Sequence, residues 1–252
     1  MTQDRPDKSH TLIEQEHQAL RHAWQWIREQ EVFVLFGVLL VVGALWGFAE
    51  LADEVLEGST RAADEHILLA LRNPADQSDP LGPSWVEEAG RDFTALGGTA
   101  VLVLVVFATC AYLLLIQNPR SALFVLIAVG GGVVLSLLLK SGFDRPRPDL
   151  VPHGSHVYTA SFPSGHSMLS AVTYLTLGAL LARTQTRRRA KFFFIGLALL
   201  ITFLVGISRV YLAVHWPTDV LAGWTLGAAW ALLCWLAVRW IEHWRQHRIV
   251  GP

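Results

Sequence analysis

Three short polar stretches interrupt the long apolar runs of this chain, and the stretch at 208–219 is the most informative. It contains Arg209, His215 and Asp219, and each such side chain costs roughly several kcal/mol within a bilayer unless it is paired or solvated. The proline after Trp216 suits a first helical turn, so we expect Asp219 one turn beyond His215. A carboxylate there can accept a hydrogen bond from the N–H of one imidazole nitrogen and leave the other nitrogen free to attack. The structural alternative is that Asp219 caps the helix and His215 stacks on Trp216.

The second stretch, Pro-Ser-Gly-His at 163–166, has the pattern of a helix start. Ser164 is a good N-cap, and Gly165 allows a ligand to approach the backbone. The first N–H groups of a helix are unpaired and favour a bound anion. We therefore expect the Ser164–Gly165 backbone to hold an anion beside His166, which could donate a proton to it. An ordinary helix start is the alternative.

Cations in and near the third stretch, 140–148, could complete an anion site. Lys140 and Arg147 flank this stretch, and Arg209 adds a second guanidinium from further along the chain. Guanidinium groups bind phosphate oxygens through paired hydrogen bonds, and lysine adds a point charge. The alternative is that these cations hold lipid headgroups at the membrane surface.

Carboxylates and cysteines offer no evident metal site. Asp144 and Asp149 lie next to Arg145 and Arg147, and we expect these residues to form ion pairs with each other. Both cysteines fall in apolar runs, which is typical of small buried side chains. The positive side chains would therefore neutralise a bound phosphate, and no metal or cofactor is expected.

Composition places the chain in a membrane. It is 52% hydrophobic and only 16% charged, whereas soluble domains average about 25% charged residues. Apolar runs of about 18 or more residues indicate membrane spans. We expect an all-α, integral membrane bundle of six transmembrane helices. The predicted spans cover residues 32–49, 96–116, 121–140, 165–182, 191–208 and 217–240.

Loop charges predict the orientation of this bundle. The connection at 183–191 has five basic and no acidic residues, and the connection at 117–120 is basic as well. Basic loops favour the cytoplasm, so both termini are expected there, whereas the acidic 50–95 connection lies outside the cell membrane. All three polar stretches then fall on the extracytoplasmic face.

The flanking segments complete the predicted organisation. Residues 1–30 have the spacing of an amphipathic helix, which lies either on the cytoplasmic membrane surface or in solution. The membrane domain covers 31–241, and 242–252 form a cytoplasmic tail. Short helices are expected at about 59–72 and 84–94 within the 50–95 connection, which caps the bundle or acts as a lid.

In order and spacing, the polar stretches resemble the three motifs of the type-2 phosphatidic acid phosphatase superfamily. These motifs are Lys, six residues, Arg-Pro at 140–148; Pro-Ser-Gly-His at 163–166; and Ser-Arg, five residues, His, three residues, Asp at 208–219. The resemblance covers about residues 90–240. It implies a metal-independent phosphatase acting on a phosphomonoester or a pyrophosphate.

The resemblance also implies roles for the site residues. His215 is the nucleophile that forms a phosphohistidine, Asp219 orients it, and His166 protonates the leaving oxygen. The phosphoryl oxygens are held by Lys140, Arg147, Ser164, Gly165 and Arg209.

A site at headgroup level predicts a membrane lipid phosphate as substrate. In a bacterial inner membrane the candidates are undecaprenyl pyrophosphate, phosphatidylglycerol phosphate and phosphatidic acid. A lipid phosphotransferase would use the same phosphohistidine, whereas a membrane transporter explains the spans but not the paired histidines. Nothing points to a nucleic-acid partner. Residues that could contact the leaving group are His153, His156, Tyr158 and Thr159.

Overall fold

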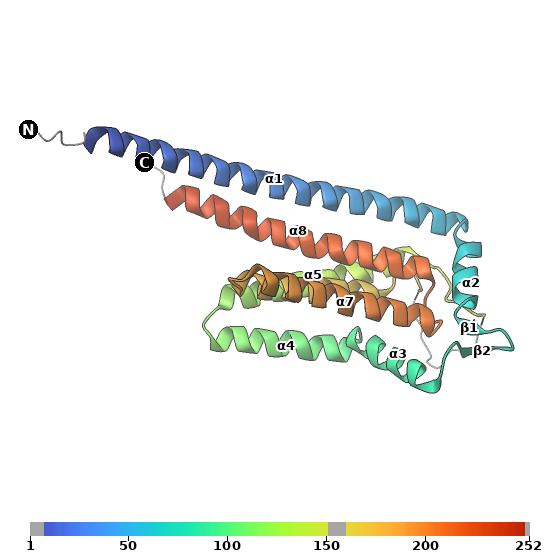
Figure 1. Cartoon of the computed structure of the whole chain (residues 1–252). Helices are drawn as coiled ribbons and strands as arrows, with labels where there is room; N and C mark the ends of the chain where they lie inside the picture. Colours follow the sequence, from blue (N-terminus) through green and yellow to red (C-terminus); the bar gives the residue numbers. More distant parts are fainter. Residues whose placement is uncertain (1–7, 151–159, 250–252) are drawn as a thin grey trace, which may run out of the picture.

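The computed structural model describes residues 8–150 and 160–249, with side chains for 32–150 and 160–242. The four leaving-group candidates in the 151–159 loop lie outside the described residues. Long helices run side by side and a small two-stranded sheet lies at one end (Figure 1). The elements are α1 (Lys8–Glu57), α2 (Arg61–Leu69), β1 (Arg72–Asn73), β2 (Asp76–Pro80), α3 (Ser84–Leu96), α4 (Thr99–Leu115), α5 (Pro119–Gly142), α6 (Gly165–Thr184), α7 (Arg188–Tyr211) and α8 (Pro217–Ile249).

Among the described residues, five helices are long and apolar enough to cross a membrane: α1 from Val32, α5, α6, α7 and α8. Helices α3 and α4 meet at a bend of 50°, and the pair qualifies only as one broken segment. The helical membrane bundle is therefore as predicted, with five spans or six if the bent pair crosses as a unit. The predicted helix at 84–94 corresponds to α3, which leads directly into α4.

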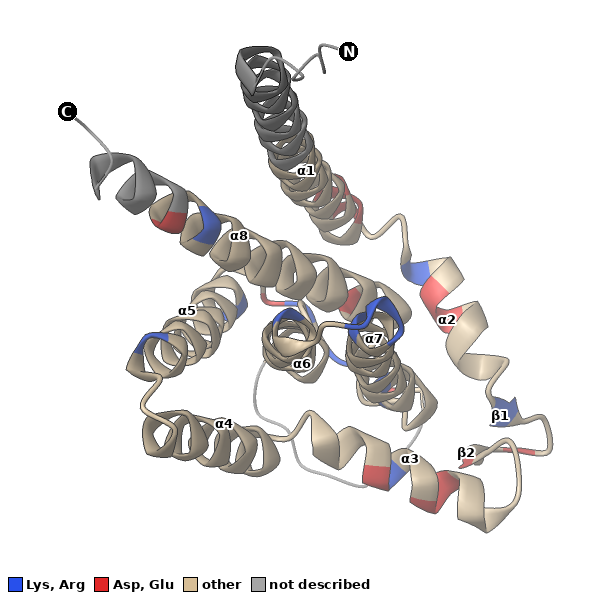
Figure 2. Cartoon of the chain, turned by 60° about the vertical axis from the view of Figure 1, so that its left-hand side comes forward, with Lys and Arg blue, Asp and Glu red and all other residues tan. Residues whose placement is uncertain are grey.

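Helix α6 is the central helix of the bundle. It contacts α4, α5, α7 and α8, and Figure 2 shows it among their ribbons. Its mean hydropathy is only 1.2, whereas that of the span in α1 is 2.6. Half of its most apolar 18-residue stretch is nevertheless buried, compared with 11% of the corresponding stretch in α1. The hydroxyl-bearing residues that weaken this span face neighbouring helices, as small polar residues do in membrane bundles. They are Ser167, Ser170, Thr173 and Thr176.

Two glycines let α8 approach α6 closely. A β-carbon at Gly223 would lie 2.7 Å from the carbonyl oxygen of Ser164, and one at Gly227 would lie 2.5 Å from that of Met168. Glycines four residues apart on one helix face commonly permit such close packing in membranes. This contact places the N-terminal ends of α6 and α8 side by side.

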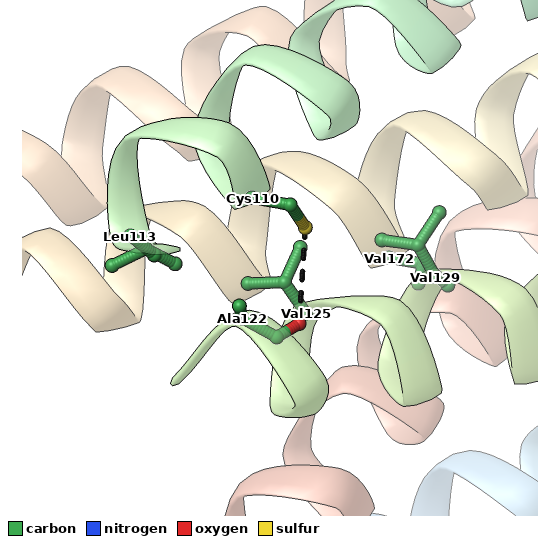
Figure 3. Packing of buried hydrophobic residues seen from close by; sticks show 6 residues of the cluster. All are labelled: Cys110, Leu113, Ala122, Val125, Val129 and Val172. Atoms are coloured by element: carbon green, nitrogen blue, oxygen red, sulfur yellow. Dashed lines mark hydrogen bonds between the residues drawn. The ribbon is translucent and has the colours of Figure 1, made fainter. Parts of the chain in front are cut away.

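Apolar packing joins α4, α5 and α6 on the other side of the central helix (Figure 3). Cys110 lies in this cluster, and its thiol donates to the carbonyl oxygen of Ala122 at 3.7 Å. Its burial confirms the expectation that Cys110 is a small core residue. The cluster consists of Cys110, Leu113, Ala122, Val125, Val129 and Val172.

The N-terminal half differs from the prediction in two respects. Helix α1 is one continuous backbone helix of 50 residues, so residues 8–30 do not form a separate helix and the span extends past residue 49 to Glu57. The side chains of 8–31 lie outside the described residues, so their amphipathic role stays a prediction. Helix α2 lies within the predicted 59–72 range, but the antiparallel pair β1–β2 that follows it was not expected.

Candidate active site

The ends of four helices bring the three polar stretches together. Lys140 lies in the last turn of α5, His166 in the first turn of α6, Arg209 in the last turn of α7, and Asp219 in the first turn of α8. His215 lies in the short α7–α8 connection. These ends meet at one end of the bundle, as the predicted topology requires.

Hydrogen bonds tie the stretches to one another. The backbone N–H of Ser164 donates to the carbonyl oxygen of Asp219 at 2.9 Å. The indole N–H of Trp216 donates to the carbonyl oxygen of Pro146 at 3.0 Å. A direct contact thus fixes each of the first two motifs to the third.

A tight turn after α7 sets the position of His215. The N–H of Val214 donates to the Arg209 carbonyl at 3.1 Å, and the N–H of Ala213 donates to the Val210 carbonyl at 2.9 Å. This is the pattern of a Schellman motif, in which the residue after the cap is left-handed. Ala213 takes that conformation with φ of 53°, and its buried methyl packs with Leu68 and Trp216. The turn therefore directs the following residues back toward the bundle.

Asp219 performs both roles that its spacing allowed. Its Oδ2 lies 3.3 Å from Nδ1 of His215, and it also accepts the backbone N–H of Trp216 at 3.0 Å. The second bond caps the start of α8, since Asp219 reaches back to the N–H of the residue before the helix. Ser161 donates its hydroxyl to the same carboxylate oxygen and lies 3.3 Å from Nδ1.

Neighbouring groups define the protonation of His215, which is 1% exposed. Nη1 of Arg147 lies 3.1 Å from Nε2 of the imidazole and also donates to the Val214 carbonyl at 2.7 Å. A guanidinium only donates, so Nε2 must accept and Nδ1 must carry the proton that faces Asp219. Burial, together with the positive charges of Arg209 and Arg147, lowers the pKa of His215 to about 4 despite the opposing effect of Asp219. The ring is therefore neutral at pH 7, with the Nε2 lone pair toward Arg147.

Arg209 and Lys140 add positive charge beside this ring. Arg209 is 8% exposed and donates from Nη1 to the Thr94 hydroxyl at 3.0 Å, while its buried Nε–H has no partner among the described residues. Lys140 lies against Gly165, where a β-carbon would be 3.4 Å from the ammonium nitrogen. A buried donor without a partner is costly, and a bound anion would satisfy it.

His166 lies within the same group of charges. Its imidazole interacts electrostatically with Arg209, His215, Lys140 and Arg147. A β-carbon at Gly97, at the bend between α3 and α4, would lie 3.3 Å from the β-carbon of His166, so the bend brings glycine against this histidine. The two histidines thus lie on one face of the bundle, as the sequence requires.

One expectation for the helix start at α6 was wrong. The N–H of Ser164 is already bonded to Asp219, so it is not open to an anion. The Ser164 hydroxyl oxygen accepts from Ser167, from the N–H at 3.5 Å and from the hydroxyl at 3.0 Å, as an N-cap does. Among the described residues, its own hydroxyl hydrogen and the N–H groups of Gly165 and His166 are the donors that this turn could offer to an anion.

The expected pairing of Arg145 with Asp144 or Asp149 was also wrong. Nη1 of Arg145 lies 2.6 Å from Oδ1 of Asp219, and Nη2 lies 2.7 Å from Oδ2 of Asp64. The Arg145 side chain is only 13% exposed, and Asp64 is buried on α2. Arg145 therefore connects the segment after α1 to the carboxylate that contacts the candidate nucleophile.

Asp64 was missed because nothing in its local sequence distinguishes it from a surface carboxylate. It accepts the Thr218 N–H at 3.0 Å and the Thr218 hydroxyl at 2.6 Å in addition to Arg145. Arg72, on β1, donates to the Tyr211 carbonyl at 2.6 Å and so caps the end of α7. The 50–95 connection thus packs on both helix ends that flank His215. Within the side chains described, no three His, Cys, Asp or Glu residues form a group suited to a metal ion.

Comparisons with known proteins agree with this geometry. A family model for the PAP2 superfamily matches residues 121–242. Phosphatidylglycerophosphatase B of Bacillus subtilis is 34% identical over 185 residues, which cover 71% of this chain and 85% of that protein. Lipid A 1-phosphatase of Rhizobium etli is 29% identical over 176 residues, which cover 60% of this chain and 71% of that protein.

A solved structure gives the same result for the fold. The crystal structure of a transmembrane PAP2-type phosphatidylglycerolphosphate phosphatase from Bacillus subtilis superposes with a TM-score of 0.71 at 30% identity. The match covers 80% of this chain and 96% of that one. The relatives and the shared fold define an integral membrane phosphatase, a hydrolase of phosphoric monoesters or lipid pyrophosphates. The chain belongs to the PAP2 superfamily, which confirms the resemblance of its three motifs.

Proposed function

We propose that this protein dephosphorylates a membrane lipid through a covalent phosphohistidine on Nε2 of His215, without a metal ion. The observation that carries the proposal is the fixed tautomer of this ring. Asp219 accepts a hydrogen bond from Nδ1–H, and the lone pair on Nε2 faces Arg147 within a group of cations. A neutral, oriented imidazole beside positive charge is what an attack on a phosphoryl group requires.

The reaction has two steps. In the first, Nε2 of His215 forms a bond to phosphorus, the bond to the leaving lipid oxygen breaks, and His166 gives that oxygen a proton. The imidazole becomes cationic, and Asp219 stabilises the charge through Nδ1–H. In the second step, His166 takes a proton from water, the resulting oxygen attacks phosphorus, and the N–P bond breaks to release phosphate.

The cations stabilise the phosphoryl oxygens in both steps. Charge spreads over three equatorial oxygens in the transition state, so fixed donors around them lower the barrier. In the resting site Arg147 donates a hydrogen bond to Nε2. When the substrate enters, this N–H would donate to a phosphoryl oxygen instead. The oxygen-binding groups are Lys140, Arg147, Arg209, the Ser164 hydroxyl and the Gly165 backbone.

For the topology, we propose six spans, with α3–α4 crossing as one bent segment. The basic start of α7 is at the opposite end from Arg209, and basic loops favour the cytoplasm. The site then faces the extracytoplasmic side of a bacterial inner membrane. Both termini, 1–30 as an amphipathic segment and 242–252 as a tail, are cytoplasmic, and 31–241 form the phosphatase domain.

A lipid phosphate of the outer leaflet of this membrane is the proposed substrate. Relatives are named for phosphatidylglycerophosphate and for the 1-phosphate of lipid A, and both are phosphomonoesters on a membrane lipid. The candidates are phosphatidylglycerol phosphate, phosphatidic acid and undecaprenyl pyrophosphate. A phosphotransferase would share the first step and pass the group to another lipid.

The test uses purified protein in detergent with excess chelator and these three lipids. We expect phosphate release that survives the chelator and falls about 10³-fold or more in His215→Ala. His66→Ala, a change at an exposed histidine on α2, is the matched control and should keep full activity. Equal release by His215→Ala would exclude the nucleophile role. Labelled lipid separates the two reactions, since a transferase moves the label to a second lipid instead of free phosphate.

A further inference from the structure

A cavity lies at the other end of the bundle from the active site, between the C-terminal end of α6, the start of α7 and the second half of α8. Its volume is about 450 Å³, within the usual range for a ligand pocket of roughly 300–1,000 Å³. The wall consists mainly of apolar side chains. They include Ala179, Ile195, Ala231, Leu232 and Trp235.

Three cations line this otherwise apolar cavity. They are Arg183, Lys191 and Arg239, one from each of the three helices. Arg183 forms an ion pair with Glu242 at 2.7 Å, and the guanidinium of Arg239 lies 5.2 Å from the ring centre of Trp235. Among the described side chains, three positive charges against one carboxylate give this cavity a net positive charge.

We propose that this cavity binds an anionic phospholipid of the cytoplasmic leaflet, with one acyl chain inside and the headgroup phosphate against Lys191 and Arg239. An apolar interior alone would accept any lipid chain. The excess of cations selects a negative headgroup, since basic pockets between membrane helices attract anionic lipids. Lys191 lies in the first turn of α7. In the proposed topology this turn lies at the headgroup layer of the cytoplasmic leaflet.

Lipid bound here would act on the helices that carry the active site. The cavity is lined by α6, α7 and α8, and the opposite ends of these helices carry His166, Arg209 and Asp219. A ligand that binds only the folded protein stabilises it in proportion to its concentration and affinity. Bound anionic lipid should therefore stabilise the packing of α6, α7 and α8 against one another. The proposal stands whether or not His215 forms a phosphohistidine.

The test compares dioleoyl phosphatidylglycerol with dioleoyl phosphatidylcholine, added to the full chain in neutral detergent. Both are phosphodiesters, so neither offers the terminal phosphate on which the enzyme acts. Thermal unfolding and native mass spectrometry give the affinity for each lipid. We expect phosphatidylglycerol to bind and stabilise the wild type more strongly than phosphatidylcholine does.

Variants assign this preference to the cavity. The double variant Lys191→Gln, Arg239→Gln should bind phosphatidylglycerol about 30-fold more weakly, since each basic residue near an anionic surface contributes roughly a factor of five. Arg120→Gln removes a charge at the start of α5, at the same end of the bundle but outside the cavity. This variant should behave as wild type. Ala231→Phe fills the cavity without changing its charge and should reduce binding of both lipids. Equal affinity of the wild type for both lipids, or unchanged phosphatidylglycerol binding in the double variant, would overturn the proposal.

Discussion

Replacing Asp64 by asparagine tests whether a residue outside the three motifs positions Asp219, the carboxylate proposed to orient His215. Asp64 is 1% exposed and holds Arg145 at 2.7 Å, and Arg145 in turn holds Asp219 at 2.6 Å. Its two oxygens also accept the N–H and the hydroxyl of Thr218. Every contact of this carboxylate is with a donor, so an amide nitrogen at either oxygen position would face a donor.

The expected magnitude follows from these contacts. A hydrogen bond to a charged group contributes about 1.5–3 kcal/mol, so the variant should lose about 2 kcal/mol of unfolding free energy. For a chain of this size that loss corresponds to a decrease in Tm of roughly 4–8 °C. Among the described residues, Asp219 would then be the one carboxylate that still contacts Arg145. We expect the guanidinium to draw the Asp219 carboxylate away from His215. We expect kcat to fall about tenfold, because 1.4 kcal/mol on the barrier corresponds to a factor of ten.

The assay measures kcat and KM for one lipid phosphate alongside Tm, with Asp92→Asn on α3 as the matched control. Asp92 is an exposed carboxylate on the same face of the bundle, so its loss should leave all three values unchanged. KM of the Asp64 variant should stay within twofold of wild type, because Asp64 is not among the groups proposed to hold phosphate. A lower Tm with an unchanged kcat would refute the positioning role and leave Asp64 a structural residue.

Two further predictions concern protonation and packing. His215 must be neutral to attack, and burial lowers its pKa to about 4, so kcat/KM should stay high from pH 7 to 5 and fall with an apparent pKa near 4. An acid limb centred at 6.5 would contradict a buried nucleophile. Gly223→Ala should lower unfolding free energy by about 1–3 kcal/mol, because its β-carbon would lie 2.7 Å from the Ser164 carbonyl. The control Gly196→Ala meets nothing within 4 Å and should be neutral or stabilising in a Tm measurement, so equal Tm values for the two variants would argue against the close α6–α8 contact.

The sequence predicted the parts of the site that depend on local spacing. His215 and Asp219 lie four residues apart across a helix start, and this spacing alone allows the carboxylate to reach both the imidazole and the backbone N–H of Trp216. The meeting of the three motifs at one face followed from counting spans. Each motif lies at the end of a long apolar run, so the number of spans assigns it to one side of the membrane.

Contacts between distant segments could not be read in this way. Asp64 and Arg145 are 81 residues apart, and each has a closer oppositely charged residue that looks like the natural partner. The Ser164 N–H suits an anion in any isolated helix start, and only the close approach of α8 assigns it to the Asp219 carbonyl. The bend between α3 and α4 likewise depends on packing, since Gly97 lies against His166.

Two carboxylates and two guanidinium groups form one chain of contacts with the neutral imidazole of His215, and this chain indicates where a substrate would enter. Asp64, Arg145, Asp219, His215 and Arg147 follow one another, with neighbouring atoms 2.6 to 3.3 Å apart. The first three are buried or nearly so, and each has further partners that hold its position. The proposed attack on phosphorus would have to break the contact between Arg147 and Nε2, because the lone pair in that contact would form the new bond. A phosphoryl group that enters there would place its phosphorus against the Nε2 lone pair and its oxygens against the Arg147 guanidinium. In this proposal the substrate replaces the contact between Arg147 and Nε2 and supplies the negative charge that the guanidinium lacks there.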